Sequence, residues 1–170
     1  MFPELRTDIE LLSLATYFAQ AAEVLSQEDA ASGAVLPLTL NALYALAKLG
    51  KPQDLVKAAF ELRLACIGGY TPDLSGCAVC GREDCGRFSV TGGVLQCAQC
   101  GDGEGLSLPV SSGCLAAMRY IVSCDAKRLF SFSLEGPARR ELAEAAETYL
   151  VTQLEHGFYT LDFYKSLLLT

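Results

Sequence analysis

The residues in this sequence that could do chemistry are two pairs of cysteines, Cys77-x2-Cys80 and Cys97-x2-Cys100, with sixteen residues between them. Zn²⁺ prefers four tetrahedral ligands, with thiolate sulfurs at about 2.3 Å. Each C-x2-C turn places two sulfurs along one edge of such a tetrahedron, so the two turns together supply all four ligands. The sequence therefore predicts one structural Zn²⁺ per chain, with no open position for a catalytic water.

The stretch between the two pairs supports a zinc ribbon. Residues 88–95 are typical of a strand, a tight turn and a second strand. Gly81 and Gly101 directly follow the pairs, where a positive φ lets backbone amides point at the sulfurs. Cys85 lies in the same stretch and could replace one ligand. Disulfides would need an oxidising compartment, and redox C-x2-C motifs a βαβ setting, which the pattern does not show.

The other candidate groups favour structural roles. Cys66, Cys114 and Cys124 fall in helical segments, where cysteine behaves as a small buried apolar side chain. The single histidine, His156, lies at the C-terminal end of a helix, a position that the helix dipole favours. The sequence has no glycine-rich phosphate loop, no G-x-S-x-G and no H-E-x-x-H. We therefore expect a binding or scaffold protein and not an enzyme.

Composition limits the partners. The chain has 13 basic and 20 acidic residues, a net charge of −7 and a pI near 4.7. Phosphate binding depends on clustered Lys and Arg, so this chain is not by itself a strong nonspecific nucleic-acid binder. The N-terminus lacks the pattern of a signal peptide, and no stretch has about 18 uninterrupted apolar residues. A soluble, cytoplasmic protein without a membrane role is expected.

The basic residues lie mainly in the C-terminal half, at Arg119, Lys127, Arg128, Arg139 and Arg140. Two more, Arg82 and Arg87, lie in the cysteine-rich stretch. Two interpretations stay open. They can be solvated surface charge, or Arg119, Arg128, Arg139 and Arg140 can form a basic rim beside an apolar groove that accepts an acidic peptide or a nucleic-acid backbone.

Helical periodicity precedes the cysteines. Thr7 and Glu10 form a capping box for a helix that ends near Ser26. A second helix is predicted over about 36–49, stopped by Gly50 in the C′ position. Its expected buried face consists of Leu36, Leu40, Leu43, Tyr44 and Ala47. A third helix over 52–67 is apolar on most sides and should be central to the core.

Helical signal returns after Ser111. One helix carries Cys114, Leu115, Met118, Ile121 and Val122 on one face, and a short piece follows at 125–130. Pro137 opens a last long helix that Gly157 closes, and the aromatic tail 158–169 should pack back on the helices. The fold class expected is mainly α: a helical bundle formed by 1–70 and 107–170, with an inserted four-cysteine zinc-ribbon β-hairpin module at 71–106.

Three segments resemble the bacterial recombination mediator RecO. F-E-L-R-L at 60–64 leads to G-Y-T-P-D-L at 69–74, and C-A-V-C-G at 77–81 precedes the hairpin and second cysteine pair at 88–100. Residues 149–163 are similar to the family's closing helix and S-L-D-F tail, with Thr160 where serine is usual. The resemblance covers essentially all 170 residues.

The resemblance implies a mediator of DNA repair and homologous recombination in the RecF pathway. Such proteins bind single-stranded DNA, the acidic C-terminal tail of single-strand binding protein and RecR, and they help to load RecA and to anneal complementary strands. They are bacterial, cytoplasmic and nucleoid-associated. RecO proteins begin with an OB-fold that this chain lacks, so weak DNA binding is expected. The alternative is a zinc-ribbon interaction module or a redox-sensing protein with no direct DNA role.

Overall fold

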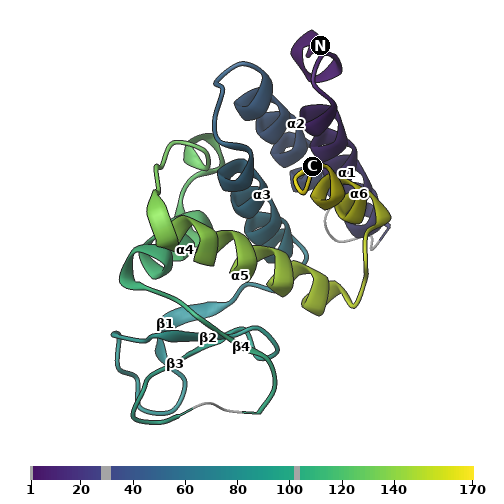
Figure 1. The fold of residues 1–170 in the computed structure, drawn as a ribbon. Coiled ribbons are helices and arrows are strands. Elements are labelled where there is room, and N and C mark those ends of the chain that lie inside the picture. The colour runs from purple at the N-terminus through teal and green to yellow at the C-terminus, as the bar shows by residue number, and fades with distance from the viewer. Residues whose placement is uncertain (1, 28–31, 102–103) are drawn as a thin grey trace.

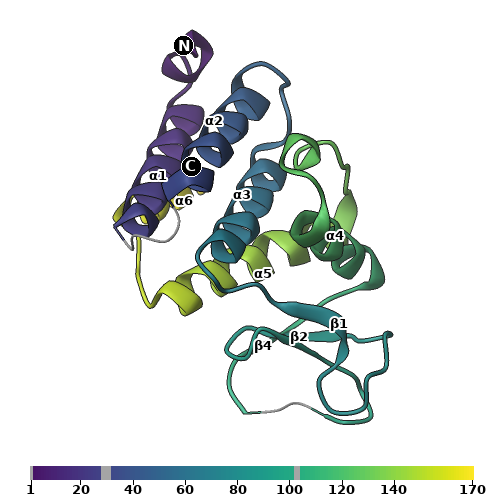
Figure 2. The ribbon, with the colours of Figure 1, turned by 180° about the vertical axis from the view of Figure 1, so that it is seen from behind.

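The computed structural model of the chain describes residues 2–27, 32–101 and 104–170. The helices lie on one side of the molecule, and four short strands form a separate layer below α5 (Figure 1). The view from behind agrees (Figure 2). The elements are η1 (Pro3–Arg6), α1 (Ile9–Ser26), α2 (Ser32–Ala47), α3 (Gln53–Ile67), β1 (Asp73–Cys77), β2 (Arg87–Ser89), β3 (Val94–Gln96), β4 (Ser107–Pro109), α4 (Ser112–Ser123), η2 (Ala126–Arg128), α5 (Gly136–Leu154) and α6 (Tyr159–Leu167). The predicted fold class, mainly helical with a small cysteine-bearing sheet, is confirmed.

The first helix ends at Ser26 as predicted, but its cap differs from the prediction. Asp8, not Thr7, is the N-cap, and its carboxylate accepts hydrogen bonds from the amides of Glu10 and Leu11 at 2.9 and 3.1 Å. The Thr7 hydroxyl instead donates to the carbonyl of Glu4. A carboxylate is the stronger acceptor and carries the charge that a helix N-terminus favours, so Asp8 takes the position.

The predicted apolar face of the second helix is wrong for three of its five residues, while Leu43 and Ala47 are half-buried against the core. Helix α2 begins four residues earlier, at Ser32, and ends at Ala47, three residues before Gly50. Leu36, Leu40 and Tyr44 of the predicted face are exposed, whereas the buried residues of α2 are Val35, Leu38, Thr39, Ala42, Ala45 and Leu46. Because α2 carries no charged residue on any side, its periodicity does not distinguish the two faces. Packing against α1 and α3 decides between them.

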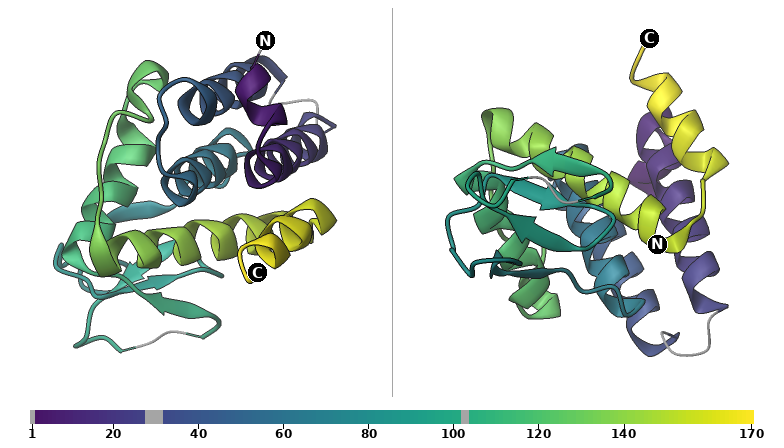
Figure 3. Two further views of the ribbon diagram at one scale, coloured as in Figure 1. Left: turned by 45° about the horizontal axis from the view of Figure 1, so that its top comes forward. Right: turned by 90° about the horizontal axis from the view of Figure 1, so that it is seen from below.

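Helix α3 is the centre of the fold, as predicted. It contacts α5, α2, α4 and α1, and nearly every residue from Leu55 to Ala65 is buried. Figure 3 (left) shows α1, α2 and α3 close to end-on, with α5 running across them. The rings of Phe18 and Phe60 stack at a centroid distance of 4.2 Å. A helix apolar on most of its surface needs neighbours on most sides, and the four helices provide them.

The last two helices depart from the prediction at one boundary. Helix α5 contains Pro137 in its first turn as predicted, but it ends at Leu154 and not at Gly157. Glu155 takes the left-handed conformation there, with φ of 49°, which turns the chain two residues before the glycine. The tail forms α6, which packs against α1, so the prediction that it packs back on the helices is confirmed.

The strands form one sheet in the order β1-β3-β2-β4. The predicted hairpin is present: β2 and β3 are antiparallel, with Phe88 opposite Leu95. The prediction missed β1, which pairs with β3 in parallel, and β4, which pairs with β2. These strands are too short for a period-2 pattern to show in the sequence.

Among the described residues, no helix is both long enough and apolar enough to cross a lipid bilayer.

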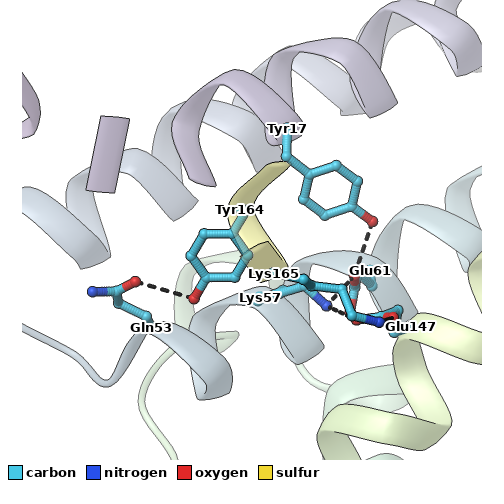
Figure 4. A network of polar contacts seen from close by, with 7 residues as sticks. All are labelled: Tyr17, Gln53, Lys57, Glu61, Glu147, Tyr164 and Lys165. Carbon is cyan, nitrogen blue, oxygen red and sulfur yellow. Dashed lines mark hydrogen bonds and ion pairs between the residues drawn. The ribbon is translucent and has the colours of Figure 1, made fainter. Parts of the chain in front are cut away.

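A charged network lies inside the helical layer (Figure 4). Lys57 of α3 is 2.8 Å from the carboxylate of Glu61 and 2.6 Å from that of Glu147 on α5. The Tyr17 hydroxyl from α1 donates to Glu61 at 2.8 Å, and Lys165 from α6 donates to Glu147 at 2.5 Å. The Glu61 side chain is fully buried, and that of Lys57 is 7% exposed. The network therefore joins four helices through paired charges.

Burial and pairing act against each other on these groups. Burial by itself works to lower the pKa of Lys57, but the carboxylates of Glu61 and Glu147 outweigh it and raise that pKa. Burial raises the pKa of Glu61 against the opposing effect of Lys57. One Glu61 oxygen, Oε2, has no hydrogen-bond partner. The pair is thus stable only as a unit, because each charge needs the other.

We expect Lys57→Met to lower the free energy of unfolding by roughly 3–5 kcal/mol, because it leaves Glu61 buried without a counter-charge. The double variant Lys57→Met/Glu61→Leu should regain most of that loss. Urea unfolding measures both. Lys48→Met is the control, since it removes only the exposed ion pair with Glu4 and should cost a small fraction as much. Equal losses for Lys57→Met and Lys48→Met would contradict the prediction.

Candidate metal centre and its surroundings

The structure brings the four predicted ligands together. The sulfur atoms of Cys77, Cys80, Cys97 and Cys100 all lie within 4.8 Å of one another. Cys77 is the last residue of β1, Cys97 directly follows β3, and the other two lie in the turns beyond. The Sγ atoms of Cys80 and Cys97 are 3.6 Å apart. Sulfurs at about 2.3 Å from a tetrahedral metal lie roughly 3.8 Å apart, so the group has the dimensions of a four-thiolate site.

Both cysteine turns have the backbone that the glycines predicted. Gly81 and Gly101 have φ values of +75° and +72°. In the first turn, the Gly81 amide donates to the carbonyl of Cys77 at 2.8 Å, and the Cys77 amide donates to the carbonyl of Arg82 at 2.8 Å. Residues other than glycine rarely adopt a positive φ. This backbone conformation closes each turn so that the amides face the sulfurs.

Backbone amides lower the pKa of two of the four thiols, Cys77 and Cys97. Hydrogen bonding from the Cys80 amide, followed by those of Val79 and Cys97, lowers the pKa of Cys77 to about 6. The amide of Cys100 in the same way lowers the pKa of Cys97. Hydrogen bonds with Cys80 and Cys97 raise the pKa of Cys100 to about 12. Four sulfurs this close cannot all carry negative charge unless a cation lies among them, and a thiophilic metal ion would supply it.

The remaining cysteines lie outside this group. Cys85 is buried and donates its thiol to the carbonyl of Arg82 at 3.1 Å. Cys114 is fully buried, as predicted. Cys66 and Cys124 are only half-buried, which corrects the prediction for these two. Cys124 is the C-cap of α4, and its sulfur accepts a hydrogen bond from Arg63 at 3.2 Å.

Side chains from α4 and α5 hold the sheet against the helices. Arg119 donates to the carbonyls of Leu74 and Glu83, at 2.9 and 3.3 Å. Tyr149 donates to the carbonyl of Tyr70 at 2.7 Å. Gln153, one turn further along α5, donates to the carbonyl of Val90 at 2.8 Å, and the Tyr149 ring meets Phe88 edge-on at 5.3 Å. Sequence reasoning missed these roles. The sequence feature that could have indicated these roles is a polar group on the apolar face of a helix.

The four arginines of the predicted rim have different surroundings. Arg119 is engaged with the sheet, and Arg139 donates to the Asp54 carboxylate at 2.7 Å. Arg128 and Arg140 are exposed. Arg82 donates to Gln99, and Arg87 to Ser107. His156 is exposed and its ring lies 4.8 Å from that of Phe158. The basic rim itself stays a prediction.

Two adjacent hollows lie between α2 and η2, and we call them together the α2–η2 groove. Their volumes are about 160 and 270 Å³, and both are bordered by Asn41 and Ala126. The smaller one contains Arg63 and the larger one Lys127. The apolar lining comes from Leu38, Tyr44, Leu49, Ile67, Leu129 and Phe130. The two charged residues among the described lining are therefore both basic.

These features define a helical domain that carries a small four-cysteine sheet docked on its α5 side. The model of the family described as "Recombination protein O C terminal" matches residues 6–162. The chain therefore belongs to the RecO family, and the resemblance seen in the sequence is confirmed.

Curated relatives named "DNA repair protein RecO" agree with this. That of Acetivibrio thermocellus is 31% identical over 168 residues, which is 98% of this chain and 67% of the relative. That of Roseiflexus sp. is 34% identical over 166 residues, 95% of this chain and 58% of the relative. That of Symbiobacterium thermophilum is 31% identical, with 98% and 68% covered. The chain thus spans 58–68% of the length of these relatives.

Gly93 gives a test of how closely the sheet and α5 are docked. Its φ is +64°, and a Cβ there would lie 2.8 Å from the Tyr149 hydroxyl oxygen. Gly50 has a similar φ of +57° with nothing within 4 Å of such a Cβ. We expect each Gly→Ala change to cost about 1 kcal/mol through backbone strain. Overpacking should add about 1–3 kcal/mol for Gly93→Ala alone. Urea unfolding of both variants is the measurement, and equal losses would show that the contact is loose.

Proposed function

We propose that this chain is the helical, metal-bearing part of a non-enzymatic mediator of DNA repair and homologous recombination. The observation that carries the proposal is the family match over residues 6–162 combined with the four convergent thiols. The proposed division is a helical domain of 1–70 and 107–170 with an inserted metal module of 71–106. The relatives' names supply the repair role. A protein that acts in DNA repair would be located in the cytoplasm, in association with the nucleoid.

The metal that we propose is one structural Zn²⁺, held by Cys77, Cys80, Cys97 and Cys100. The donor set supports this choice, because soft thiolates in a four-sulfur group select zinc over hard cations. Four protein ligands would complete the coordination, so the ion would order the chain and not activate water. The module has few buried apolar residues of its own, chiefly Phe88, Val90 and Leu95. A metal ion supplies the stability that so small a core lacks.

The partner that we propose for the α2–η2 groove is the acidic C-terminal tail of single-strand binding protein. The groove offers apolar hollows for aromatic or aliphatic side chains, with Lys127 at the rim. Arg63 lies inside but donates to the carbonyls of Ile121 and Cys124, so we assign it a contribution of positive charge and no direct contact with the tail. Arg128 is adjacent to Lys127 and exposed. Among the four arginines of the predicted rim, we place Arg128 in contact with the tail. Arg140 is also exposed but lies on α5, outside the lining of this groove. Arg119 and Arg139 serve to position elements, because their guanidinium groups already bind within the chain.

RecR and single-stranded DNA are further proposed partners, together with a role in RecA loading and strand annealing. The support for these is the family membership. The charge of −7 favours weak direct contact with DNA by this chain. The acidic-tail proposal would therefore account for how the chain is recruited to covered single strands, since it needs only a local basic site.

Native mass spectrometry tests the metal. We expect one zinc ion per chain in the wild-type protein. Cys97→Ser should lose it, because three thiolates bind more weakly than four. Cys85→Ser is the matched control and should keep the full zinc content. Cys85 is buried beside the site, but its thiol donates a hydrogen bond to the carbonyl of Arg82. A zinc-free chain with a disulfide would contradict the proposal and favour a redox sensor.

Fluorescence anisotropy with a labelled acidic peptide that ends in an aromatic residue tests the groove. We expect Lys127→Glu to weaken binding about tenfold or more, because it reverses a rim charge next to an apolar anchor pocket. Arg140→Glu makes the same charge change on α5 and serves as the control, with a much smaller loss expected. Equal losses from both variants would indicate attraction by net charge alone. An absence of binding at moderate salt would remove the tail from the proposal.

A further inference from the structure

A second apolar groove lies on the opposite side of the helical layer, between α1 and α6, and we call it the α1–α6 groove. Figures 1 and 2 both show α6 alongside α1. The groove has a volume of about 340 Å³. Four large apolar side chains line it and are exposed: Ile9 by 63%, Leu12 by 46%, Tyr159 by 75% and Phe163 by 53%. Exposed apolar residues gathered in this way, in place of scattered ones, mark an interaction surface.

These exposed side chains are not needed to hold α6 in place. The other face of α6 is already buried through Leu161 and Tyr164. Thr160 donates to Gln20 at 2.5 Å, and the Tyr164 hydroxyl donates to Gln53 at 3.0 Å (Figure 4 shows the second contact). Helix α6 is therefore anchored by its inner face, and its outer face is available to a partner.

Ser13 gives a second indication of a ligand. It lines the groove, is only 5% exposed, and its hydroxyl has no hydrogen-bond partner. Thr16, one turn further along α1, donates its hydroxyl to the carbonyl of Leu12 at 2.8 Å. Ser13 does not make the equivalent bond. A buried hydroxyl without a partner costs free energy, which a polar group of a bound molecule would recover.

The charges around the groove select the kind of partner. The lining residues within the described structure are all uncharged. Asp8 precedes Ile9, Asp162 precedes Phe163, and both carboxylates are exposed. Helix α1 itself carries Glu10 and Glu23 but no basic residue. The lysine of α6, Lys165, is paired with Glu147. The acidic residues of these segments outnumber the basic ones, which are Arg6 of η1 and the paired Lys165. This balance disfavours an acidic tail, and it also disfavours a second copy of a chain with net charge −7.

We propose that the α1–α6 groove binds an amphipathic helix of a partner protein whose apolar stripe is flanked by Lys or Arg. Two helices lying side by side form a groove into which a third helix packs by its side-chain ridges. The nine residues of α6 extend over about 13 Å, which is two to three turns of a partner helix. This site is separate from the α2–η2 groove, which has basic residues and is proposed for an acidic tail. The two surfaces would thus accept partners of opposite charge.

The test uses a fluorescein-labelled 14-residue probe peptide with leucines at positions i, i+3, i+4, i+7 and i+11, and lysines on both flanks. Its matched control has glutamate at each lysine position. Binding to the full chain is followed by anisotropy. The variants are Leu12→Gln with Phe163→Ser, which removes two exposed apolar contacts, and Asp162→Lys. Leu36→Gln on α2 is the control, because Leu36 is also an exposed apolar residue, by 63%, but does not line this groove.

We expect the lysine peptide to bind and the glutamate peptide not to bind. Leu12→Gln/Phe163→Ser should weaken binding at least about tenfold, as loss of interface anchors does, and Asp162→Lys about threefold. Leu36→Gln should change it by less than about twofold. Equal binding of both peptides, or equal effects of the groove and control variants, would overturn the proposal. A dimer in sedimentation that Leu12→Gln/Phe163→Ser converts to a monomer would overturn it in favour of a second copy. Circular dichroism checks that each variant is folded.

Discussion

The ammonium group of Lys57 is buried within the helical layer, and the arrangement of four helices depends on its neutralisation. The carboxylates of Glu61, on the same helix, and of Glu147, on α5, pair with this ammonium group. The Tyr17 hydroxyl from α1 donates to Glu61, and Lys165 from α6 donates to Glu147. Apolar contacts tolerate small shifts between helices, but a buried charge tolerates no loss of its partner. The network therefore sets how α1, α5 and α6 lie on α3, and in this way it sets the α1–α6 groove.

Helix α5 transmits that arrangement to the cysteine module. Glu147 belongs to the network, and two residues later Tyr149 reaches the carbonyl of Tyr70 at the entrance to the sheet. Gln153 then binds Val90 in the loop between β2 and β3. Arg119 of α4 holds β1 and the loop near Cys85 from the other side. The module is thus held against the bundle through its backbone carbonyls and through Phe88, whose ring contacts that of Tyr149, so its buried residues share one core with the helices.

Electrostatics distinguishes the two apolar grooves, although the chain as a whole is acidic. The α2–η2 groove contains Arg63 and Lys127, whereas the α1–α6 groove has an uncharged lining with the exposed Asp8 and Asp162 next in sequence to two of its residues. Because charges at the rim of an interface govern partner choice more than its total area does, the two grooves would discriminate between partners. A net charge of −7 taken alone would have hidden this difference.

The sequence by itself determined the features that depend on short-range spacing. The two C-x2-C pairs, the positive φ of Gly81 and Gly101, the hairpin around Gly92 and the central position of α3 all follow from local patterns. Tertiary structure decided what depends on distant partners: which face of the uncharged α2 is buried, the roles of Arg119 and Arg139, and the parallel strand β1. The physical reason is that burial and ion pairing are settled by segments far apart in the chain, such as Lys57 and Glu147, whose meeting no local pattern records.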